Sequence, residues 1–531
     1  MTDNPLERLL LTGNEALAHA ARKAGIRLGS GYPGTPSTEV LQTLDAIGGK
    51  AQWSPNEKVA MEVAIGVAFA GARALVTMKH VGLNVAADPL FTVAETGVDG
   101  ALVVLVADDP GMASSQNEQD SRRYAVAAGI PLIEPSDSQE TYDFFGHAVA
   151  ISERWGIPVL FRMTTRVSHS KSIVRAGALV CEPPRKPSFR RDIPGRVMIP
   201  AYARPAHRRL RQKLEQIAAW NESGPLNKIL PGTSETGIVA AGIAMMHARE
   251  AAPDAPLFKV GMSHPLPVEA IRSFAAPLKR CVVIEEGDPI MVDTCRAAGL
   301  TVEGKPEPFR FGELNVNRVL RILNHDTSPE TAPPPGRPPQ LCPGCPHRTV
   351  FEILHKLDCI VSGDIGCYTL GVLPPFQAMD TCVCMGASIG VGLGLRHALP
   401  PEQARRVVSV IGDSTFVHSG ITGIAEMLYN PPETGHVVLI LDNHTTAMTG
   451  LQDHPGTGRT LDGEPAHTLV FEDMLRGMGV PDIQVLDAQA DPTVFEKLLT
   501  ERLQRGTLSV IITRKPCLLA ARKQRQADPG G

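Results

Sequence analysis

The sequence predicts an α/β fold built from doubly wound, mainly parallel sheets, and two observations support this class. Short runs of apolar, β-branched residues alternate with helical stretches along most of the 531 residues, a pattern typical of a parallel sheet covered by helices. Hydrophobic residues make up 43% of the chain, enough to form cores for about three domains. We expect these domains at residues 1–182, 206–330 and 341–531, joined by linkers at 183–205 and 331–340.

The composition argues against two classes of partner. The formal net charge is −4 and no dense block of lysine and arginine occurs, so we expect no nucleic-acid partner. The stretch MTDNPLERLL has acidic residues and a proline where a signal peptide has basic residues, and no apolar run is long enough to span a bilayer. We therefore expect no membrane segment and a cytoplasmic location.

The first predicted domain places polar residues at the ends of its strands. Its strand candidates are Leu28–Tyr32, Ala74–Met78, Ala101–Ala107 and Pro158–Arg162. In the turn GYPGTPSTEV, Ser37 or Thr38 can cap the following helix, and Thr35 either belongs to an ordinary turn or faces a ligand at this edge of the sheet. Glu57 begins the next helix, where it either caps the helix or bonds a buried cofactor ring.

Two more segments of this domain are candidates for the same edge. Lys79 and His80 directly follow the strand Ala74–Met78, and each is either a solvated loop residue or part of a site. The polar loop Ser114–Arg123 follows another strand. Most such loops are solvated, but an arginine here can hold a substrate carboxylate through two parallel hydrogen bonds.

The middle of the chain predicts a smaller α/β domain without a dense catalytic constellation. The proline-rich stretches PPRKPSFRRDIPGR and PPPGRPP read as linkers on either side of it. Its expected elements are a charged helix at His207–Trp220 and strands at Gly237–Ala241, Leu257–Val260 and Cys281–Glu285. The acidic turn formed by Glu285, Glu286 and Asp288 reads as a solvated or inter-domain edge, with metal binding as the weaker alternative.

The third predicted domain begins with LCPGCPHR, in which Cys342 and Cys345 form a C-x-x-C motif. Six of the ten cysteines lie between Cys342 and Cys384, which indicates a metal centre or buried thiols rather than a disulfide framework. The spacing leaves a zinc site, a redox dithiol, an iron–sulfur cluster and plain burial open. The cysteines that could complete a site are Cys359, Cys367, Cys382, Cys384 and Cys517.

Two strand ends in this domain predict a magnesium site. The runs Val407–Ile411 and Val437–Leu441 read as buried strands, and Asp413 and Asn443 follow them closely. Oxygen donors at the carboxyl edge of a parallel sheet suit a magnesium ion that also holds phosphates, with a further backbone carbonyl near Thr445. The glycine-rich turns GDIGCYTLG and MGASIGVGLGL bring backbone amides that can approach phosphate oxygens. This combination is the pattern of a thiamine diphosphate site.

Taken together, these motifs resemble the large, thiamine-binding subunit of indolepyruvate ferredoxin oxidoreductase, a branch of the 2-oxoacid:ferredoxin oxidoreductases. The matching blocks are GYPGTPSTE, NEKVAMEVAIG, MKHVGLNVAADP, DDPGMASSQNEQDSR, CPGCPHR, GDIGCYTLG, MGASIG, IGDSTFVHSG and LDNHTTAMTG. The resemblance implies the thiamine diphosphate-binding fold twice, with a domain like the transketolase C-terminal domain between them. It also implies oxidative decarboxylation of an arylpyruvate with coenzyme A, which gives an aryl-acetyl-CoA, carbon dioxide and reduced ferredoxin.

The resemblance assigns roles to individual residues. Asp413 and Asn443 match the side-chain ligands of magnesium, and Thr445 the backbone-carbonyl ligand. Glu57 matches the glutamate that bonds the aminopyrimidine of thiamine. The other cofactor-binding positions are Gly366, Gly386, Gly412 and Ser414, and the other catalytic candidates are Thr35 and Arg122 at the substrate carboxylate and His80, with His347 and His444 as alternatives for proton transfer.

The resemblance also favours one four-iron, four-sulfur (4Fe-4S) cluster, held by Cys342, Cys345, Cys367 and Cys517. Many family members carry a ferredoxin-like domain with dense C-x-x-C-x-x-C runs, which this sequence lacks. The electrons are therefore expected to leave by the proximal cluster, through another subunit, or to a different acceptor, so the final acceptor is ferredoxin or another one. The family implies a smaller partner subunit and a dimer of heterodimers. Two alternatives stay open, a non-oxidative thiamine-dependent 2-oxoacid decarboxylase and a thiamine-binding scaffold subunit without activity of its own.

Overall fold

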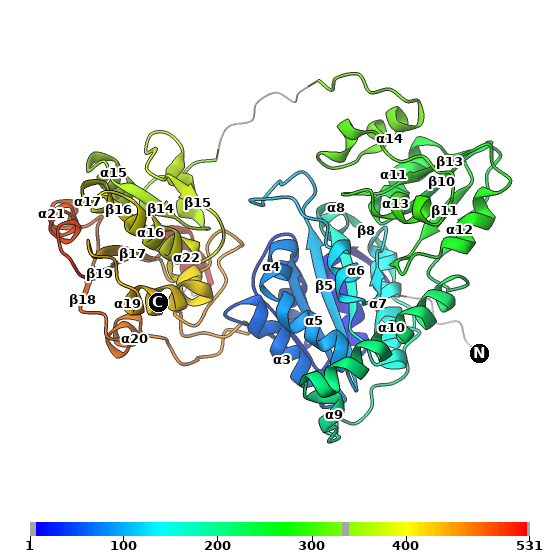
Figure 1. Cartoon of the computed structure of the whole chain (residues 1–531), viewed down its shortest axis with the longest axis horizontal. Coiled ribbons are helices and arrows are strands. Elements are labelled where there is room, and N and C mark those ends of the chain that lie inside the picture. Colours follow the sequence, from blue (N-terminus) through cyan, green and yellow to red (C-terminus); the bar gives the residue numbers. More distant parts are fainter. Residues whose placement is uncertain (1–6, 332–338, 528–531) are drawn as a thin grey trace. The chain divides into compact units, whose positions relative to one another are not determined.

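The computed structural model describes residues 7–331 and 339–527. The chain divides into two compact units, Met1–Thr331 and Ala332–Gly531. Figure 1 colours the first unit from blue to green and the second from yellow-green to red. In the part of the chain that is described, no helix is both long and apolar enough to cross a bilayer.

The first unit contains a seven-stranded sheet, called here the first sheet. Its strand order is β12-β6-β7-β5-β4-β2-β3. The bounds are β2 Leu28–Gly31, β3 Ala51–Trp53, β4 Arg73–Lys79, β5 Ala101–Asp108, β6 Leu132–Ile133, β7 Val159–Thr164 and β12 Met262–His264. All pairs except β12–β6 are parallel. The four predicted strands of this domain are therefore present, with ends that differ by one or two residues.

Helices of the first unit begin and end where the local sequence supplies caps. Helix α3 (Glu57–Phe69) begins after Asn56, whose side chain accepts a hydrogen bond from the amide of Val59. Helix α7 (Ser138–Trp155) begins after Asp137 and ends at Gly156, which adopts the left-handed conformation that glycine tolerates. Helix α3 packs on β2 and β4, and α7 packs on β5 and β7. The remaining helices here are α1 Gly13–Lys23, α2 Thr38–Ala46, α4 His80–Val85, α5 Ala87–Thr96, α6 Arg122–Ala128 and α8 Thr165–His169.

A second sheet in the same unit corresponds to the smaller predicted domain. Its order is β13-β10-β11-β9, with bounds β9 Lys228–Leu230, β10 Thr236–Ala241, β11 Leu257–Val260 and β13 Arg280–Ile284. Helices α11 Ile243–Ala251, α12 Val268–Ala275, α13 Ile290–Ala297 and α14 Val316–Leu323 accompany it. The short strand β12 follows β11 in the chain but pairs with β6, so the two sheets are joined within one unit. Separately, β1 (Arg8–Thr12) and β8 (Lys171–Arg175) form an antiparallel pair.

Part of the predicted linker 183–205 is helical. Helix α9 spans Ile193–Arg196, and α10 spans Pro200–Asn221, earlier than the expected start at His207. Pro200 lies in the first turn, where the missing amide hydrogen costs nothing because no intrahelical acceptor exists there. The domain boundaries otherwise stay predictions.

The second unit is a parallel sheet of six strands, called here the third sheet. Its order is β15-β14-β16-β17-β19-β18, with bounds β14 Ile360–Gly363, β15 Thr381–Cys382, β16 Val407–Gly412, β17 His436–Asp442, β18 Asp482–Leu486 and β19 Leu508–Arg514. Successive residues of a strand point to opposite faces. Val437 and Leu439 of β17 accordingly join one hydrophobic cluster, and Val438 and Ile440 join another.

Helices cover both faces of the third sheet. One cluster includes residues of α15 (His347–Lys356) and α21 (Pro492–Leu503), and the other includes residues of α16 (Ala387–Ala398), α19 (Ile421–Tyr429) and α20 (Phe471–Met478). A parallel sheet that is buried on both faces defines the doubly wound class. Ligands of such sheets bind outside the carboxyl ends of the strands, so the ends of β16 and β17 are the first place to look for a site.

Candidate functional site

The ends of β16 and β17 bring the three predicted magnesium ligands together. Two backbone amides donate to the carboxylate of Asp413, that of Ser414 to Oδ1 at 2.8 Å and that of Asn443 to Oδ2 at 3.2 Å. The side-chain oxygen of Asn443 in turn accepts a hydrogen bond from the amide of Thr445 at 3.1 Å. All three residues are buried. Their proximity is a property of the structure, whereas their role as metal ligands stays a prediction.

His454 also belongs to this cluster, and the sequence analysis missed it. Its Nε2 lies 3.3 Å from Oδ2 of Asp413, and both side chains are buried. Burial alone would raise the pKa of Asp413, but the contacts with His454 and the Ser414 amide lower that pKa below its usual value. We call Asp413, Asn443, Thr445 and His454 the Asp413 site.

The backbone of the glycine-rich turns next to this site is held by hydrogen bonds to nearby protein side chains. Asp364, which follows β14, accepts hydrogen bonds from the amides of Ile365, Gly386 and Ser388. Gly386 has φ of +85°, and a Cβ there would lie 2.5 Å from Cβ of Ser419, so glycine is required. The amide of Gly366 donates to the Thr369 hydroxyl.

Three backbone amides that were predicted to bind phosphate oxygens therefore donate to protein oxygens in this structure. They are the amides of Gly366, Gly386 and Ser414. Gly412, another predicted cofactor position, directly precedes Asp413. A Cβ at this glycine would lie 2.6 Å from the Tyr368 ring, so close packing alone accounts for the residue. The cofactor-binding role of these positions stays a prediction.

Four cysteines line one cavity of about 90 Å³ beside the Asp413 site. They are the four predicted cluster ligands, Cys342, Cys345, Cys367 and Cys517, and Asn443 also lines the cavity. The amide of Cys517 donates to the carbonyl oxygen of Asn443 at 3.0 Å, so a backbone hydrogen bond joins the cavity to the Asp413 site.

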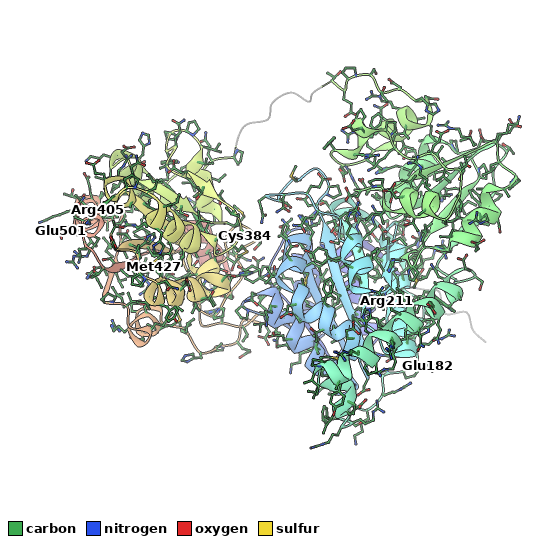
Figure 2. All side chains as sticks on the ribbon, in the orientation of Figure 1. Glu182, Arg211, Cys384, Arg405, Met427 and Glu501 are labelled. Atoms are coloured by element: carbon green, nitrogen blue, oxygen red, sulfur yellow. The ribbon has the colours of Figure 1, made fainter. Side chains whose placement is uncertain are left out.

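The remaining cysteines of the third domain lie elsewhere. Cys359 packs against the core, while Cys382 and Cys384 are exposed; Cys384 is labelled in Figure 2. The protein therefore separates the four predicted cluster ligands from the other thiols of this domain.

The cavity does not yet have the geometry of a metal centre. Within residues 7–331 and 339–527, no three side chains of His, Cys, Asp or Glu gather as metal ligands. Burial raises the pKa of the Cys345 thiol, and it raises the pKa of Cys367 to about 11. A metal would have to displace the protons of these two thiols. The predicted magnesium set contains a single such side chain, Asp413, so its other donors are amide and backbone oxygens.

In the first unit, Glu57 is buried at the start of α3. Asn56, the residue before Glu57, caps this helix with its side chain, so Glu57 is not the N-cap residue. A Cβ at Gly82 would lie 2.5 Å from Oε1 of Glu57, so helix α4 approaches the carboxyl group directly. Thr35 is half-buried in the loop between β2 and α2.

His80 and Lys79 lie where β4 passes into α4. The ring nitrogen Nε2 of His80 is 3.1 Å from the carbonyl oxygen of Asn117, and burial lowers the pKa of this histidine. Lys79 donates from Nζ to the carbonyl oxygen of Ser114 at 3.0 Å. Both residues therefore hold the loop that follows β5.

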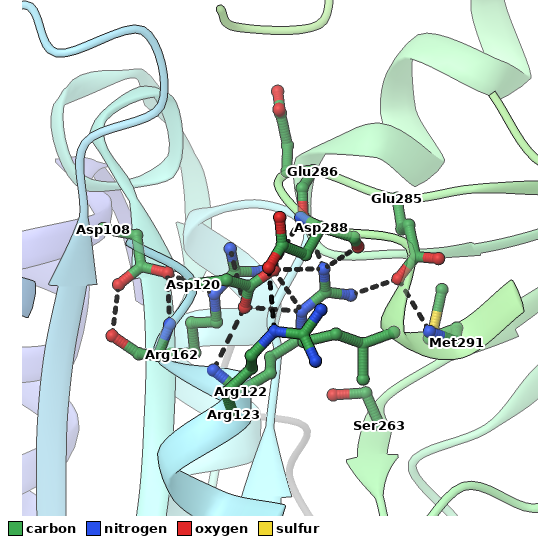
Figure 3. A network of polar contacts seen from close by, with 12 residues as sticks. Asp108, Asp120, Arg122, Arg123, Arg162, Ser263, Glu285, Glu286, Asp288 and Met291 are labelled. Atoms are coloured by element: carbon green, nitrogen blue, oxygen red, sulfur yellow. Dashed lines mark hydrogen bonds and ion pairs between the residues drawn. The ribbon is translucent and has the colours of Figure 1, made fainter. Parts of the chain in front are cut away.

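Arg122, which the family resemblance assigns to the substrate carboxylate, is buried at the start of α6. It is 1% exposed, and each of its three side-chain nitrogens donates to a protein oxygen. Nε and Nη2 bind the carboxylate of Asp120 at 2.9 and 2.6 Å, and Nη1 binds Glu285 at 2.5 Å. Nη2 also donates to the carbonyl oxygens of Glu286 and Asp288 (Figure 3). In this arrangement no side-chain nitrogen of Arg122 is left without a protein acceptor.

A second arginine completes this cluster. Arg162 binds Asp108 at 2.7 Å and Glu134 at 2.6 Å, and lies 3.7 Å from Asp120. Burial would raise the pKa of Asp120, but Arg122 and Arg162 hold it well below its usual range. We call Asp108, Asp120, Arg122, Arg162 and Glu285 the buried ion network. Because Glu285 follows β13 and the other four belong to the first sheet or the segment after β5, the network joins the first sheet to the second, as the inter-domain reading of the acidic turn expected.

Comparisons with known proteins identify the class first. Residues 19–208 match the family model "Pyruvate flavodoxin/ferredoxin oxidoreductase, thiamine diP-bdg", and residues 364–513 match "Thiamine pyrophosphate enzyme, C-terminal TPP binding domain". The two matches fall in the first and second units. The chain is therefore a thiamine diphosphate-binding protein of the 2-oxoacid:ferredoxin oxidoreductase superfamily.

Individual relatives define the family within that class. The indolepyruvate oxidoreductase subunit IorA of Archaeoglobus fulgidus is 39% identical over 98% of this chain and 88% of that protein. The IorA subunit of Methanothermobacter thermautotrophicus is 40% identical over 97% of this chain and 88% of that protein. The chain belongs to the family of indolepyruvate oxidoreductase IorA subunits.

Among solved structures, a 2-oxoglutarate:ferredoxin oxidoreductase from Magnetococcus marinus is similar in fold. The TM-score is 0.51 at 15% identity, over 61% of this chain and 66% of that chain. The predicted fold class, with parallel α/β sheets of the thiamine diphosphate-binding type, is confirmed.

Proposed function

We propose that this chain is the thiamine-binding subunit of an enzyme that oxidatively decarboxylates an arylpyruvate with coenzyme A. The products are an aryl-acetyl-CoA and carbon dioxide, and two electrons pass to ferredoxin or another acceptor. The observation that carries the proposal is the backbone hydrogen bond from Cys517 to Asn443. It ties a cavity lined by four cysteines to a cluster of magnesium-type oxygen donors, as an enzyme that takes electrons from a thiamine-bound substrate requires.

The residues of the Asp413 site fit magnesium diphosphate by their chemistry. A carboxylate, an amide oxygen and the backbone carbonyl of Thr445 are hard oxygen donors of the kind that magnesium prefers. Thiamine diphosphate, when bound, supplies the carbanion chemistry of the decarboxylation. Asp413 and Asn443 would hold the metal, and the buried carboxyl group of Glu57 would bond and orient the aminopyrimidine. Thr35 and His80 remain candidates for substrate contact and proton transfer.

The four cysteines fit one 4Fe-4S cluster by number and by their common cavity. Cluster sites of this kind use four thiolates. Loading must release thiol protons, because burial raises the pKa of the Cys345 and Cys367 thiols. The cluster would carry single electrons away from the Asp413 site. The relatives are named as subunits of an oxidoreductase, which supports a smaller partner subunit for this chain. A dimer of heterodimers and a cytoplasmic location belong to the same proposal.

The test is anaerobic purification together with the partner subunit, followed by iron and sulfide analysis and an activity assay. We expect indolepyruvate, coenzyme A and an electron acceptor to give indole-acetyl-CoA, and Glu57→Gln to abolish this product while leaving the fold intact. Cys517→Ser should lower the iron content, whereas Cys384→Ser, outside the cavity, should not. Aldehyde release without coenzyme A would support the non-oxidative decarboxylase, and full activity of the Glu57→Gln complex would support a scaffold subunit.

A further inference from the structure

The proposed function puts the substrate-binding loop with Thr35 at the carboxyl edge of the first sheet, where the side-chain nitrogens of Arg122 all donate to protein oxygens. A substrate carboxylate that leaves water needs a charged donor to replace its hydration. Both fully buried arginines near this edge, Arg122 and Arg162, are paired with protein carboxylates. Arg123 pairs with Asp288, and Arg166 pairs with Glu313.

Lys79 is a cation at this edge whose ammonium group has hydrogen-bond donors that no protein carboxylate uses. It is the last residue of β4, and its Nζ makes a hydrogen bond to the carbonyl oxygen of Ser114. Within the described residues, Lys79 takes part in no ion pair. An ammonium group has three hydrogens to donate, so two remain for a ligand.

The side chain of Lys79 lies over the loop that carries Thr35. A Cβ added at Gly34 would lie 3.5 Å from Cγ and 3.6 Å from Cδ of Lys79, which is van der Waals contact. The aliphatic part of the lysine thus lies beside Gly34. Burial lowers the pKa of Lys79, while the negative charges of Asp109 and Glu57 raise it. Lys79 therefore lies beside the predicted substrate-binding loop.

The loop that holds the ammonium group is itself fixed. Asp109 accepts hydrogen bonds from the amide and hydroxyl of Ser114 and from the hydroxyl of Ser115. Further along, Ser121 donates from its amide and its hydroxyl to Asp108, a member of the buried ion network. The carbonyl oxygen of Ser114 therefore has a defined position, and Lys79 is oriented before any ligand arrives.

We propose that Lys79 binds the carboxylate of the 2-oxoacid substrate, the role that the family resemblance suggested for Arg122. The inference rests on the proposed function and adds the residue that recognises the acid group. One hydrogen of the ammonium group stays on the Ser114 carbonyl oxygen, and the others bind the carboxylate. The buried ion network acts through the loop, because it fixes the segment against which Lys79 is oriented.

The test compares Lys79→Met, Lys79→Arg and wild type, each with the partner subunit, thiamine diphosphate and magnesium. We expect Lys79→Met to raise the KM for indolepyruvate by about 10- to 100-fold, the range expected for loss of hydrogen bonds to a charged group. The Kd for thiamine diphosphate should stay close to the wild-type value. Lys79→Arg should recover part of the affinity because it keeps the charge. Lys58→Met, which removes an exposed lysine next to Glu57 on the same helix, is the matched control and should leave KM unchanged.

A second ligand separates recognition of the carboxylate from a structural effect. The methyl ester of indolepyruvate lacks the negative charge, so Lys79→Met should weaken its equilibrium binding much less than binding of the acid. Equal losses for acid and ester, or an unchanged KM for the acid, would overturn the inference. If wild type formed no acyl-CoA, the proposed function would fail, and equilibrium binding of acid and ester to wild type and Lys79→Met would still decide the role of Lys79.

Discussion

Buried acidic residues lie at the carboxyl edges of both the first and the third sheet. The groups that balance their negative charge differ between the two edges. At the first sheet, Asp108 and Asp120 have an arginine within ion-pair distance. At the third sheet, Asp413 accepts from two backbone amides and contacts His454, and no lysine or arginine of the described chain pairs with it. The neighbouring Asp442, by contrast, binds Arg514 at 2.7 Å.

This difference distinguishes acids that are part of the folded core from acids that can bind a ligand. An acid that forms a buried ion pair with an arginine is part of the folded structure, because such a pair is costly to break. An acid held by amides and a histidine can still take a cation as a ligand. Asp413 directly follows β16, and Arg122 begins α6 after the loop that follows β5. The side-chain nitrogens of Arg122 all donate to protein oxygens, whereas no lysine or arginine of the described chain pairs with Asp413.

The largest effect should come from breaking the buried ion network. Arg122→Met leaves the buried carboxylate of Glu285 without its arginine and leaves Asp120 only the more distant Arg162, so we expect the free energy of unfolding to fall by about 3–5 kcal/mol. Urea unfolding followed by circular dichroism measures this loss. Arg123→Met removes an exposed pair with Asp288 and should change the stability by no more than about 0.5 kcal/mol. A stable Arg122→Met protein with a raised KM for indolepyruvate would instead indicate that Arg122 binds the substrate carboxylate.

A smaller effect should come from Glu286, a buried acid that follows β13 of the second sheet and that takes part in no ion pair within the described residues. Burial raises the pKa of Glu286 from 4.5 to about 7, although the charge of Lys305 opposes this shift. The folded state then holds a proton that the unfolded state loses above pH 4.5. The stability from this group is present at low pH and is lost as the pH rises through about 7, by up to about 3 kcal/mol.

Glu286→Gln removes this titration, so the difference in unfolding free energy between wild type and variant should change with pH between 4.5 and 7. Urea unfolding at several pH values across this window measures it. A difference that stays constant across the window would mean that Glu286 is ionised in the folded protein, and hence that Lys305 neutralises it as the arginines neutralise the other acids.

Much of the fold follows from the sequence because long periodic segments determine it. The run Val437–Leu441 predicted β17, and the alternation of its side chains between two clusters explains why the whole run is apolar. Strand β12 could not be predicted in this way, because its three residues are too few to show a period. Its pairing with β6 depends on tertiary contacts that joined two predicted domains into one unit.

The candidate site was predictable where its residues follow strands. Asp413 and Asn443 were placed together because parallel strands end at the same edge. His454 follows no strand end and no periodic segment, so only the folded chain shows its contact with Asp413. The pairing of Arg122 with Glu285 was also hidden, since Glu285 is 163 positions further along the chain and nothing in the local pattern links the two.

We infer that the edge of the third sheet can take a metal-bound cofactor, whereas Arg122 and Arg162 of the first unit are paired with protein carboxylates. Calorimetric titration of the chain with thiamine diphosphate, with and without magnesium, tests it directly. We predict magnesium-dependent binding by wild type, and binding about 100-fold weaker in Asp413→Asn, the upper range for disturbing a metal site. Folded Arg122→Met should bind thiamine diphosphate as wild type does. Undiminished binding by Asp413→Asn, or loss of binding by folded Arg122→Met, would contradict the account.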